Sequence, residues 1–394
     1  MQVVVRKALI TILLFGIVSL FADIVYEGAR SIIPGYLGLL GASAAIVGFI
    51  AGFGELLGFA LRMPFGYLAD ITRSYWLLTF MGYTVNLFAV PLLALTTDWK
   101  YAALLIFFER LGKAIRTPAR DVVLSTATKA IGRGKGFAIH EVLDQVGAIT
   151  GPAIVLTSMA LTSSYRFTFG LLAVPAIISL IALYLTYKLY PKPLESDETS
   201  QKTLQESSSI FGLGVKFWLY MISISLSTMG FMHAALILYR ARDFHVLPEE
   251  LIPSLYLIAM AVDAVFALIL GFMYDKYGLK VIGISYPLTI LIPLFALNPT
   301  YYGIILSSIF FGIVMAFQET LMRAGVADLT PVKVRGSAYG IFNAVYGVSL
   351  FISGTVMGLL YERFMLIIFY SMILQILALI VLIRLIRLTS IKQA

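Results

Sequence analysis

Residues 271–280 read Gly-Phe-Met-Tyr-Asp-Lys-Tyr-Gly-Leu-Lys, and residues 66–73 read Gly-Tyr-Leu-Ala-Asp-Ile-Thr-Arg. Both stretches contain a glycine, an aspartate four positions later and a base after the aspartate. Each stretch closes the second long apolar run of its half of the chain. A polar pattern that recurs at the same place in two halves indicates an internal repeat.

A second repeat lies further along each half. Gly112 precedes Gly136 by 24 residues, and Gly312 precedes Gly336 by the same 24. The sequence Lys-Gly-Phe-Ala that begins at residue 135 corresponds to Arg-Gly-Ser-Ala from residue 335. We therefore predict two parallel structural repeats, an arrangement in which membrane transporters bind their substrate between the two halves.

The composition places the chain in a membrane. It is 60% hydrophobic and 13% charged, and its mean hydropathy of +0.93 lies far above that of soluble domains. The first apolar run continues past residue 30 and carries charges, unlike a cleavable signal peptide. There is no cysteine, and the three histidines are widely separated, so we expect no metal site and no cofactor.

Apolar windows of bilayer length predict an all-α membrane protein with twelve transmembrane helices in two six-helix bundles. The predicted spans are residues 8–38, 43–68, 75–97, 99–118, 135–160, 166–189, 212–239, 251–274, 279–297, 301–325, 337–360 and 364–387. A long polar stretch within residues 190–211 reads as a flexible linker. We thus predict an N-terminal bundle at 1–189 and a C-terminal bundle at 212–394.

The distribution of basic residues predicts the orientation. With the N-terminus inside, the bases that fall outside are Lys100, Arg166, Arg240, Arg242 and Arg363, and a much larger number falls inside. This positive-inside bias places both termini and the linker in the cytoplasm, in a multi-pass protein of the cell membrane. Basic loops that face anionic lipid account for the net charge of +8, so we expect the lipid bilayer and no nucleic acid as a partner.

The two Gly-x-x-x-Asp stretches resemble the signature that members of the major facilitator superfamily carry between the second and third helix of each half. The copy at 271–280 is the better match, because the copy at 66–73 has Ile71 where a base is usual. The resemblance implies the twelve-helix fold of that superfamily. We expect its glycines, acids and bases to form a cytoplasmic gate, in which the aspartates cap a helix and pair with bases: Gly66, Asp70, Arg73, Gly271, Asp275 and Lys276.

Residues 23–34 and 136–152 resemble a narrower prokaryotic subgroup of drug or metabolite exporters. Glu141 stands where that subgroup carries a base. Gly147, Gly151 and Pro152 resemble the end of a motif associated with drug:proton antiporters, which favours export. Tight helix packing by two small residues four apart is the alternative explanation.

Charged side chains inside apolar spans are costly and therefore indicate a partner, a cavity or a function. Asp23, Glu27 and Arg30 share one face of the first span, and His140 and Asp144 share a face of the fifth. A buried carboxylate next to a base can take up a proton on one side of the membrane and release it on the other. The proton-coupling candidates are Glu55, Asp23, Glu27, Asp144 and Asp263.

Other polar residues of these spans are candidates for the substrate cavity. They are Tyr26, Arg30, Arg110, His140, Asn343, Tyr346 and Glu319. Glu27 and Arg30 could instead form an ion pair that serves only the structure. His140 could instead be a packing residue that makes a hydrogen bond.

The stretch 109–121, Glu-Arg-Leu-Gly-Lys-Ala-Ile-Arg-Thr-Pro-Ala-Arg-Asp, gathers charge at the cytoplasmic end of the fourth span. Arg116 and Arg120 suit the negative end of that helix. We predict that Arg110 or Arg116 pairs with Glu141 or Asp144 in an inner gate.

These observations favour a secondary transporter, a monomer that works by alternating access and exports a small organic molecule in exchange for protons. Proton-coupled uptake of an organic anion is the alternative, because arginines suit carboxylates and phosphates. A sensor on a transporter fold is a more remote one. No nucleotide-binding, zinc-protease or serine-hydrolase motif is present, so we do not predict an enzyme.

Overall fold

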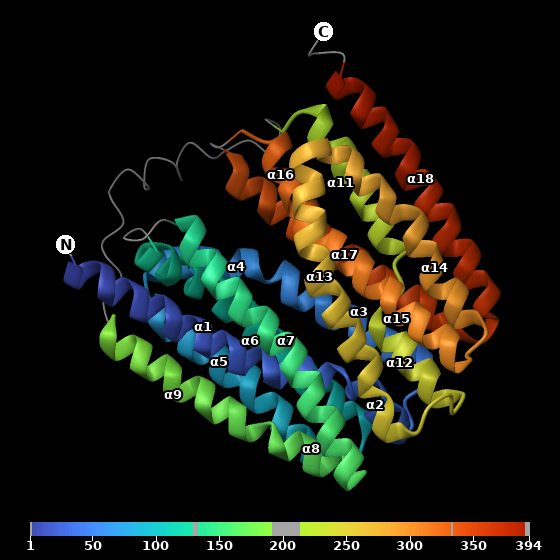
Figure 1. Cartoon of the computed structure of the whole chain (residues 1–394), viewed down its shortest axis with the longest axis horizontal. Helices are drawn as coiled ribbons and strands as arrows, with labels where there is room; N and C mark the ends of the chain where they lie inside the picture. Colours follow the sequence, from blue (N-terminus) through green and yellow to red (C-terminus); the bar gives the residue numbers. More distant parts are fainter. Residues whose placement is uncertain (1, 129–132, 191–212, 332–333, 391–394) are drawn as a thin grey trace. The chain divides into compact units, whose positions relative to one another are not determined.

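The computed structural model describes residues 2–128, 133–190, 213–331 and 334–390, and every regular element in these ranges is helical (Figure 1). The predicted linker at 190–211 lies almost entirely outside the described residues. Clustering of the contacts divides the chain into two compact units. The first unit consists of Met1–Tyr36 and Leu61–Lys202, and the second of Leu37–Ala60 and Thr203–Ala394.

The first unit is built from long helices and short helical extensions. They are α1 (Gln2–Arg30), α4 (Arg62–Thr72), α5 (Tyr75–Leu92), η1 (Leu93–Leu95), α6 (Trp99–Thr128), α7 (Arg133–Thr162), α8 (Tyr165–Leu171) and α9 (Ala173–Leu189). Helix α2 (Ile33–Leu39) contains the boundary between the units.

The second unit contains α3 and the helices that follow the linker. They are α3 (Ala44–Ala60), α11 (Val215–Met229), α12 (Ala234–Asp243), η3 (Glu249–Leu251), α13 (Pro253–Tyr277), η4 (Gly278–Ile284), α14 (Ser285–Leu297), α15 (Tyr301–Ala316), the π-helical turn η5 (Phe317–Leu321), α16 (Met322–Leu329), α17 (Arg335–Leu359), η7 (Tyr361–Arg363) and α18 (Phe364–Ser390).

Glycines hold α1 and α7 together in the first unit. A Cβ atom built at Gly151 would lie 2.6 Å from the carbonyl oxygen of Ile24, and Gly147 faces the backbone of Leu20. Only residues without a side chain permit such a close approach of two helices. The two glycines singled out in the sequence therefore place α7 directly against the face of α1 that carries Asp23.

Helices α5 and α6 meet in the same way. A Cβ atom at Gly112 would lie 2.6 Å from the carbonyl oxygen of Gly82, and one at Gly82 would lie 2.6 Å from the Cβ atom of Arg116. This contact brings the charged stretch of α6 against the polar residues of α5.

In the second unit α3 packs along α17 through Gly48, Gly52 and Gly354. A Cβ atom at Gly354 would lie 2.5 Å from the carbonyl oxygen of Gly48. Residues 44–60 therefore group with the second unit, whereas the division that we predict at the linker assigns them to the N-terminal bundle.

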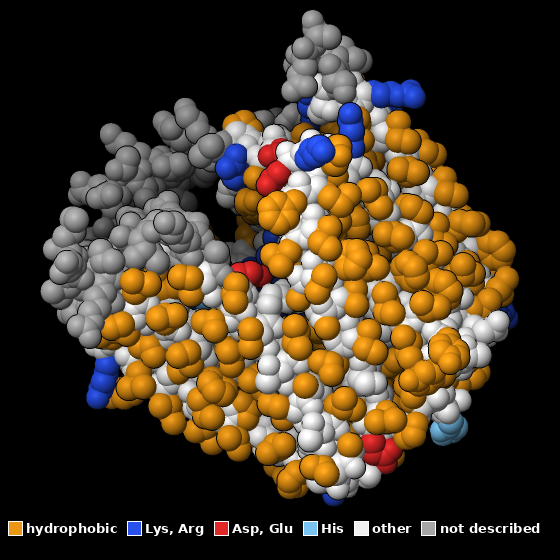
Figure 2. Space-filling view, in the orientation of Figure 1, with side chains coloured by type: hydrophobic (Ala, Val, Ile, Leu, Met, Phe, Trp, Pro, Cys, Tyr) orange, Lys and Arg blue, Asp and Glu red, His pale blue; other side chains and the backbone are white. Residues whose placement is uncertain are grey.

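Ten stretches of the described residues are long and apolar enough to cross a membrane. One of them, Glu249–Leu297, contains both α13 and α14, and α6 is not among the ten because its charged residues interrupt the apolar run. In Figure 2 hydrophobic side chains cover most of the described part of the visible face, and the charged side chains are few and lie mostly near its margins. The chain is thus a multi-pass, all-α membrane protein.

Candidate functional site

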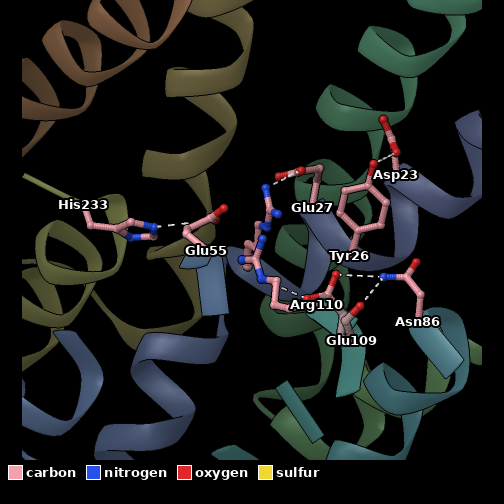
Figure 3. A network of polar contacts seen from close by, with 9 residues as sticks. Asp23, Tyr26, Glu27, Glu55, Asn86, Glu109, Arg110 and His233 are labelled. Carbon is pink, nitrogen blue, oxygen red and sulfur yellow. Dashed lines mark hydrogen bonds and ion pairs between the residues drawn. The ribbon is translucent and has the colours of Figure 1, made fainter. Parts of the chain in front are cut away.

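The charged face of α1 is buried inside the first unit. Asp23, Tyr26 and Glu27 are 5%, 6% and 7% exposed. The Tyr26 hydroxyl donates a hydrogen bond to Asp23 Oδ1, and Arg30 Nη1 pairs with Glu27 Oε1 at 2.5 Å (Figure 3). The predicted Glu27–Arg30 pair is therefore present, and the i, i+3, i+4, i+7 spacing places all four side chains on one stripe of the helix.

Three bases surround the ring of Tyr26. Lys113 Nζ lies 4.1 Å from the ring centre, and the guanidinium carbons of Arg30 and Arg116 lie 5.4 and 5.7 Å from it. These distances are those of cation–π contacts, which offset part of the cost of placing positive charge in an apolar surrounding. Tyr26 thus links the bases of α6 to the carboxylate of Asp23.

A second polar group lies between α5 and α6. Asn86 donates through Nδ2 to both the backbone oxygen and Oε1 of Glu109, each at 2.9 Å. Glu109 Oε2 in turn lies 3.0 Å from Arg110 Nε (Figure 3). All three side chains are buried, so Arg110 has a neighbouring carboxylate as its ion-pair partner.

Helix α7 contributes one further pair. His140 Nδ1 lies 3.6 Å from Asp144 Oδ2, and His140 is 3% exposed. Asp144 is also among the charges that act on Asp23 across the α1–α7 contact. Glu141, by contrast, is exposed.

The inner-gate pairing of Arg110 or Arg116 with Glu141 or Asp144 stays a prediction, and the residues of this region have the following neighbours. Arg110 pairs with Glu109, and Arg116 stacks on the ring of Tyr83 at 4.2 Å. Asp144 pairs with His140. Arg120 binds Asp121 Oδ1 through Nε and Nη2, at 2.9 and 2.8 Å.

In the second unit α3 and α12 bring two titratable side chains together. Glu55 Oε1 lies 3.9 Å from His233 Nε2, and the other ring nitrogen of His233 accepts a hydrogen bond from Ala235 N at 3.1 Å (Figure 3). His233 is the N-cap of α12, so its ring orientation is held by the helix end.

The cavity candidates of the second unit gather around η5 and α17. The Tyr346 hydroxyl donates to Gln318 Oε1 at 2.7 Å, and its ring stacks on Phe342. Glu319 and Glu55 both act electrostatically on Tyr346. A π-helical turn such as η5 frequently marks a functional position in a helix.

Two further candidates of the second unit lie on α17 and α13. Asn343 is half-buried on α17, and Asp263 is 3% exposed on α13.

The residues of the repeated glycine–aspartate motif lie at helix ends and are mostly exposed. Asp70 is exposed near the end of α4, where the Tyr75 hydroxyl lies 3.5 Å from its Oδ1. Arg73 ends that helix in the left-handed conformation, with φ of 51°. Asp275 and Lys276 are exposed near the end of α13.

Several side chains of these clusters are missing from the candidates predicted by sequence. The contacts add Tyr83, Asn86 and Gln318, and they give partners to Lys113, Glu109 and His233, which the sequence marks as charged or titratable without assigning them to a site. An asparagine or lysine in an apolar span was a usable signal, whereas a buried tyrosine in a chain with 22 of them was not. No group of three or more Asp, Glu or His side chains that could hold a metal ion lies together within the described ranges.

Comparison with known proteins identifies the family. Residues 13–246 and 219–393 each match the model of the Major Facilitator Superfamily. An uncharacterized protein of Mycobacterium tuberculosis is 39% identical over 351 residues, which are 88% of this chain and 86% of that protein. An uncharacterized MFS-type transporter of Methanocaldococcus jannaschii is 27% identical over 356 residues, or 89% of this chain and 88% of that one.

Solved structures show the same fold. A crystal structure of a mutant of the nucleoside transporter NupG superposes with a TM-score of 0.76 at 17% identity and covers 94% of this chain and 99% of its own. The all-α membrane fold and the superfamily resemblance predicted from the sequence are confirmed. The chain therefore belongs to the major facilitator superfamily, a family of membrane transporters.

Proposed function

We propose that the chain is a proton-coupled secondary transporter that moves a small organic molecule across the cell membrane by alternating access. The observation that carries the proposal is Asp23, a carboxylate that is 5% exposed in the apolar part of α1 and shares its surroundings with Lys113 and Arg116. An ionised carboxylate inside a membrane span costs free energy, so its presence indicates a partner or a function.

Exchange of partners gives Asp23 a coupling role. When it is ionised it attracts the ammonium of Lys113 and the guanidinium of Arg116, which both contact the ring of Tyr26. When it is protonated that attraction is lost, and the two bases are released to a substrate or to another carboxylate. Proton binding therefore changes which contacts link α1 to α6.

Glu55 is the corresponding candidate in the second unit. Its carboxylate lies next to His233, and histidine changes its charge near neutral pH more readily than any other side chain. We assign the pair the second proton-binding position.

Export by antiport is the direction that Gly147-x-x-x-Gly151-Pro152 favours, because this stretch resembles the end of a motif associated with drug:proton antiporters. The two glycines pack on α1 beside Asp23. One observation favours the second candidate, uptake of an organic anion together with protons. Arg116 is buried, and its Nε and Nη1 atoms lack a hydrogen-bond partner in the described part of the chain. Such a guanidinium suits a carboxylate or phosphate.

The orientation and the absence of catalysis belong to the same proposal. The positive-inside bias supports cytoplasmic termini, and the clusters described above suit binding and proton exchange rather than covalent chemistry. The first unit holds its whole cluster within one chain, which supports a functional monomer.

The test is reconstitution of the protein into liposomes that contain a pH-sensitive dye. A panel of metabolites and drug-like compounds is offered under an imposed pH gradient. We expect the transport of at least one compound to be accompanied by proton movement, which the dye reports. The sign of the pH change distinguishes antiport from symport. If no compound in a broad panel is exchanged or accumulated by folded protein, the transporter proposal fails and the sensor alternative gains.

A further inference from the structure

A buried arginine on α6 has hydrogen-bond donors without acceptors. Arg116 is 1% exposed, and neither its Nε nor its Nη1 atom has a hydrogen-bond partner among the residues that the structure describes. Its guanidinium carbon lies 4.2 Å from the ring centre of Tyr83 and 5.7 Å from that of Tyr26. Stacking on a ring offsets part of the cost of the buried charge but satisfies none of the N–H donors.

The ring beneath this arginine carries a second open donor. Tyr83 is 0% exposed, and its hydroxyl likewise has no hydrogen-bond partner in the described ranges. The close approach of α5 and α6 at Gly82 and Gly112 places this tyrosine against Arg116. Buried polar groups are almost always hydrogen-bonded, so two open donors in one contact point to a ligand.

A third helix supplies the next group. His140 Nε2 is buried without a hydrogen-bond partner in the described part of α7 and its surroundings. The other ring nitrogen faces Asp144 at 3.6 Å, and Arg116 acts electrostatically on the ring. When His140 is protonated, Nε2 becomes a donor as well.

Arg116 differs from the other arginines of the cluster. Arg30 pairs with Glu27, Arg110 with Glu109 and Arg120 with Asp121. For Arg116 the structure gives two aromatic rings as close neighbours instead. A guanidinium with open N–H donors is the group that proteins use to bind carboxylate and phosphate.

We propose that Arg116, Tyr83 and His140 form a binding site for an oxyanion, a carboxylate or phosphate group of the transported molecule. The inference rests on the proposed function only in naming the cargo as the ligand. Arg120, Asp144 and Asp121 also act electrostatically on His140, and Asp23 interacts with Arg116. Protonation of Asp23 or Asp144 reduces the repulsion of a bound anion. Anion and proton then bind together, as symport requires.

The experiment measures binding to the purified full-length chain in lipid nanodiscs. Benzoate and phenyl phosphate are the probes, benzyl alcohol is the neutral comparison, and ionic strength is held constant. We expect at least one anion to raise the midpoint of thermal unfolding in a saturable way and the alcohol to leave it unchanged. The response to benzoate against that to phenyl phosphate shows which oxyanion the site prefers.

The decisive variant is Tyr83→Phe, because it removes the hydroxyl and keeps the ring on which Arg116 stacks. We expect the dissociation constant of the bound anion to rise about tenfold, the effect of losing a hydrogen bond to a charged group. Arg116→Gln should abolish anion binding, provided that the variant protein folds. The control is Tyr286→Phe in the second unit, which removes a buried hydroxyl bonded to Ser223 at 2.7 Å and should leave binding unchanged.

Equal effects of anions and alcohol, or anion affinity in Tyr83→Phe equal to that of the unaltered protein, would overturn the site. Proton-coupled flux in liposomes is measured in parallel. Proton-coupled flux without anion binding contradicts the proposed oxyanion site and leaves the transporter proposal intact. Anion binding without any flux supports the oxyanion site and contradicts the transporter proposal.

Discussion

Glu55 on α3 and His233 at the start of α12 lie 3.9 Å apart, carboxylate oxygen to imidazole nitrogen, although they come from opposite halves of the sequence. Both belong to the second unit, because α3 packs along α17. The proton-coupling candidate that the sequence offers thus has a titratable partner that the sequence does not pair with it.

Replacing Glu55 by Gln should leave folding intact and abolish flux driven by a pH gradient. Glutamine keeps the shape of the side chain, but its amide has no carboxyl group that can bind and release a proton. The measurement is pH-dye flux in liposomes, with the thermal unfolding midpoint as the folding check. Undiminished proton-driven flux in Glu55→Gln would remove Glu55 from the coupling mechanism.

His233→Asn separates the two roles of that histidine. Asparagine is a good N-cap, so the start of α12 should be retained while the imidazole beside Glu55 is lost. We expect wild-type stability and a changed pH profile of flux. A pH profile identical to that of the unaltered protein would mean that His233 serves only as a cap.

Asp23→Asn tests the cluster of the first unit. The amide imitates the protonated carboxyl group, so we expect proton-driven accumulation to fall at least about tenfold while exchange of substrate without a gradient continues. The control is Glu362→Gln, which neutralises an exposed carboxylate and should change neither rate. Retained coupling in Asp23→Asn would place the proton site elsewhere.

Gly151→Ala should destabilise the first unit, because its new Cβ atom would lie 2.6 Å from the backbone oxygen of Ile24, which cannot move aside. Overpacking of this kind costs about 1–3 kcal/mol. The matched control is Gly170→Ala in α8, where nothing lies within 4 Å of the added carbon. Thermal unfolding in detergent compares the two, and equal midpoints would refute the packing account of α1 and α7.

Asp275→Asn concerns the repeated motif. The carboxylate is exposed at the end of α13, away from the buried clusters, so we expect slower cycling with little change in substrate affinity. Initial rates of transport and equilibrium binding of the same substrate measure the two effects. A large loss of affinity would contradict a gating role.

Much of the architecture followed from local chemistry. Apolar runs of bilayer length predict helices wherever they occur, since backbone groups in a membrane must bond within their own segment. The order of helices, the stripe of Asp23, Glu27 and Arg30, and the pair of His140 with Asp144 were all predictable, because residues three and four apart meet on one helix face.

Contacts between helices could not be obtained in this way. The sequence marks Arg116 as charged, but only the approach of α5 to α6 at Gly82 places it on Tyr83 with open donors. The sequence likewise did not predict His233 as the partner of Glu55, because the two residues lie on different helices.

The sequence by itself determined the class of protein, its helices and the charges that each helix carries, because hydropathy and helical spacing are local properties. The tertiary structure decided which of those charges meet. Asp23 faces the bases of α6, Asn86 of α5 binds Glu109 of α6, and Glu55 lies by His233. These pairings depend on which helices approach one another and how closely, and the order of residues along the chain does not specify that.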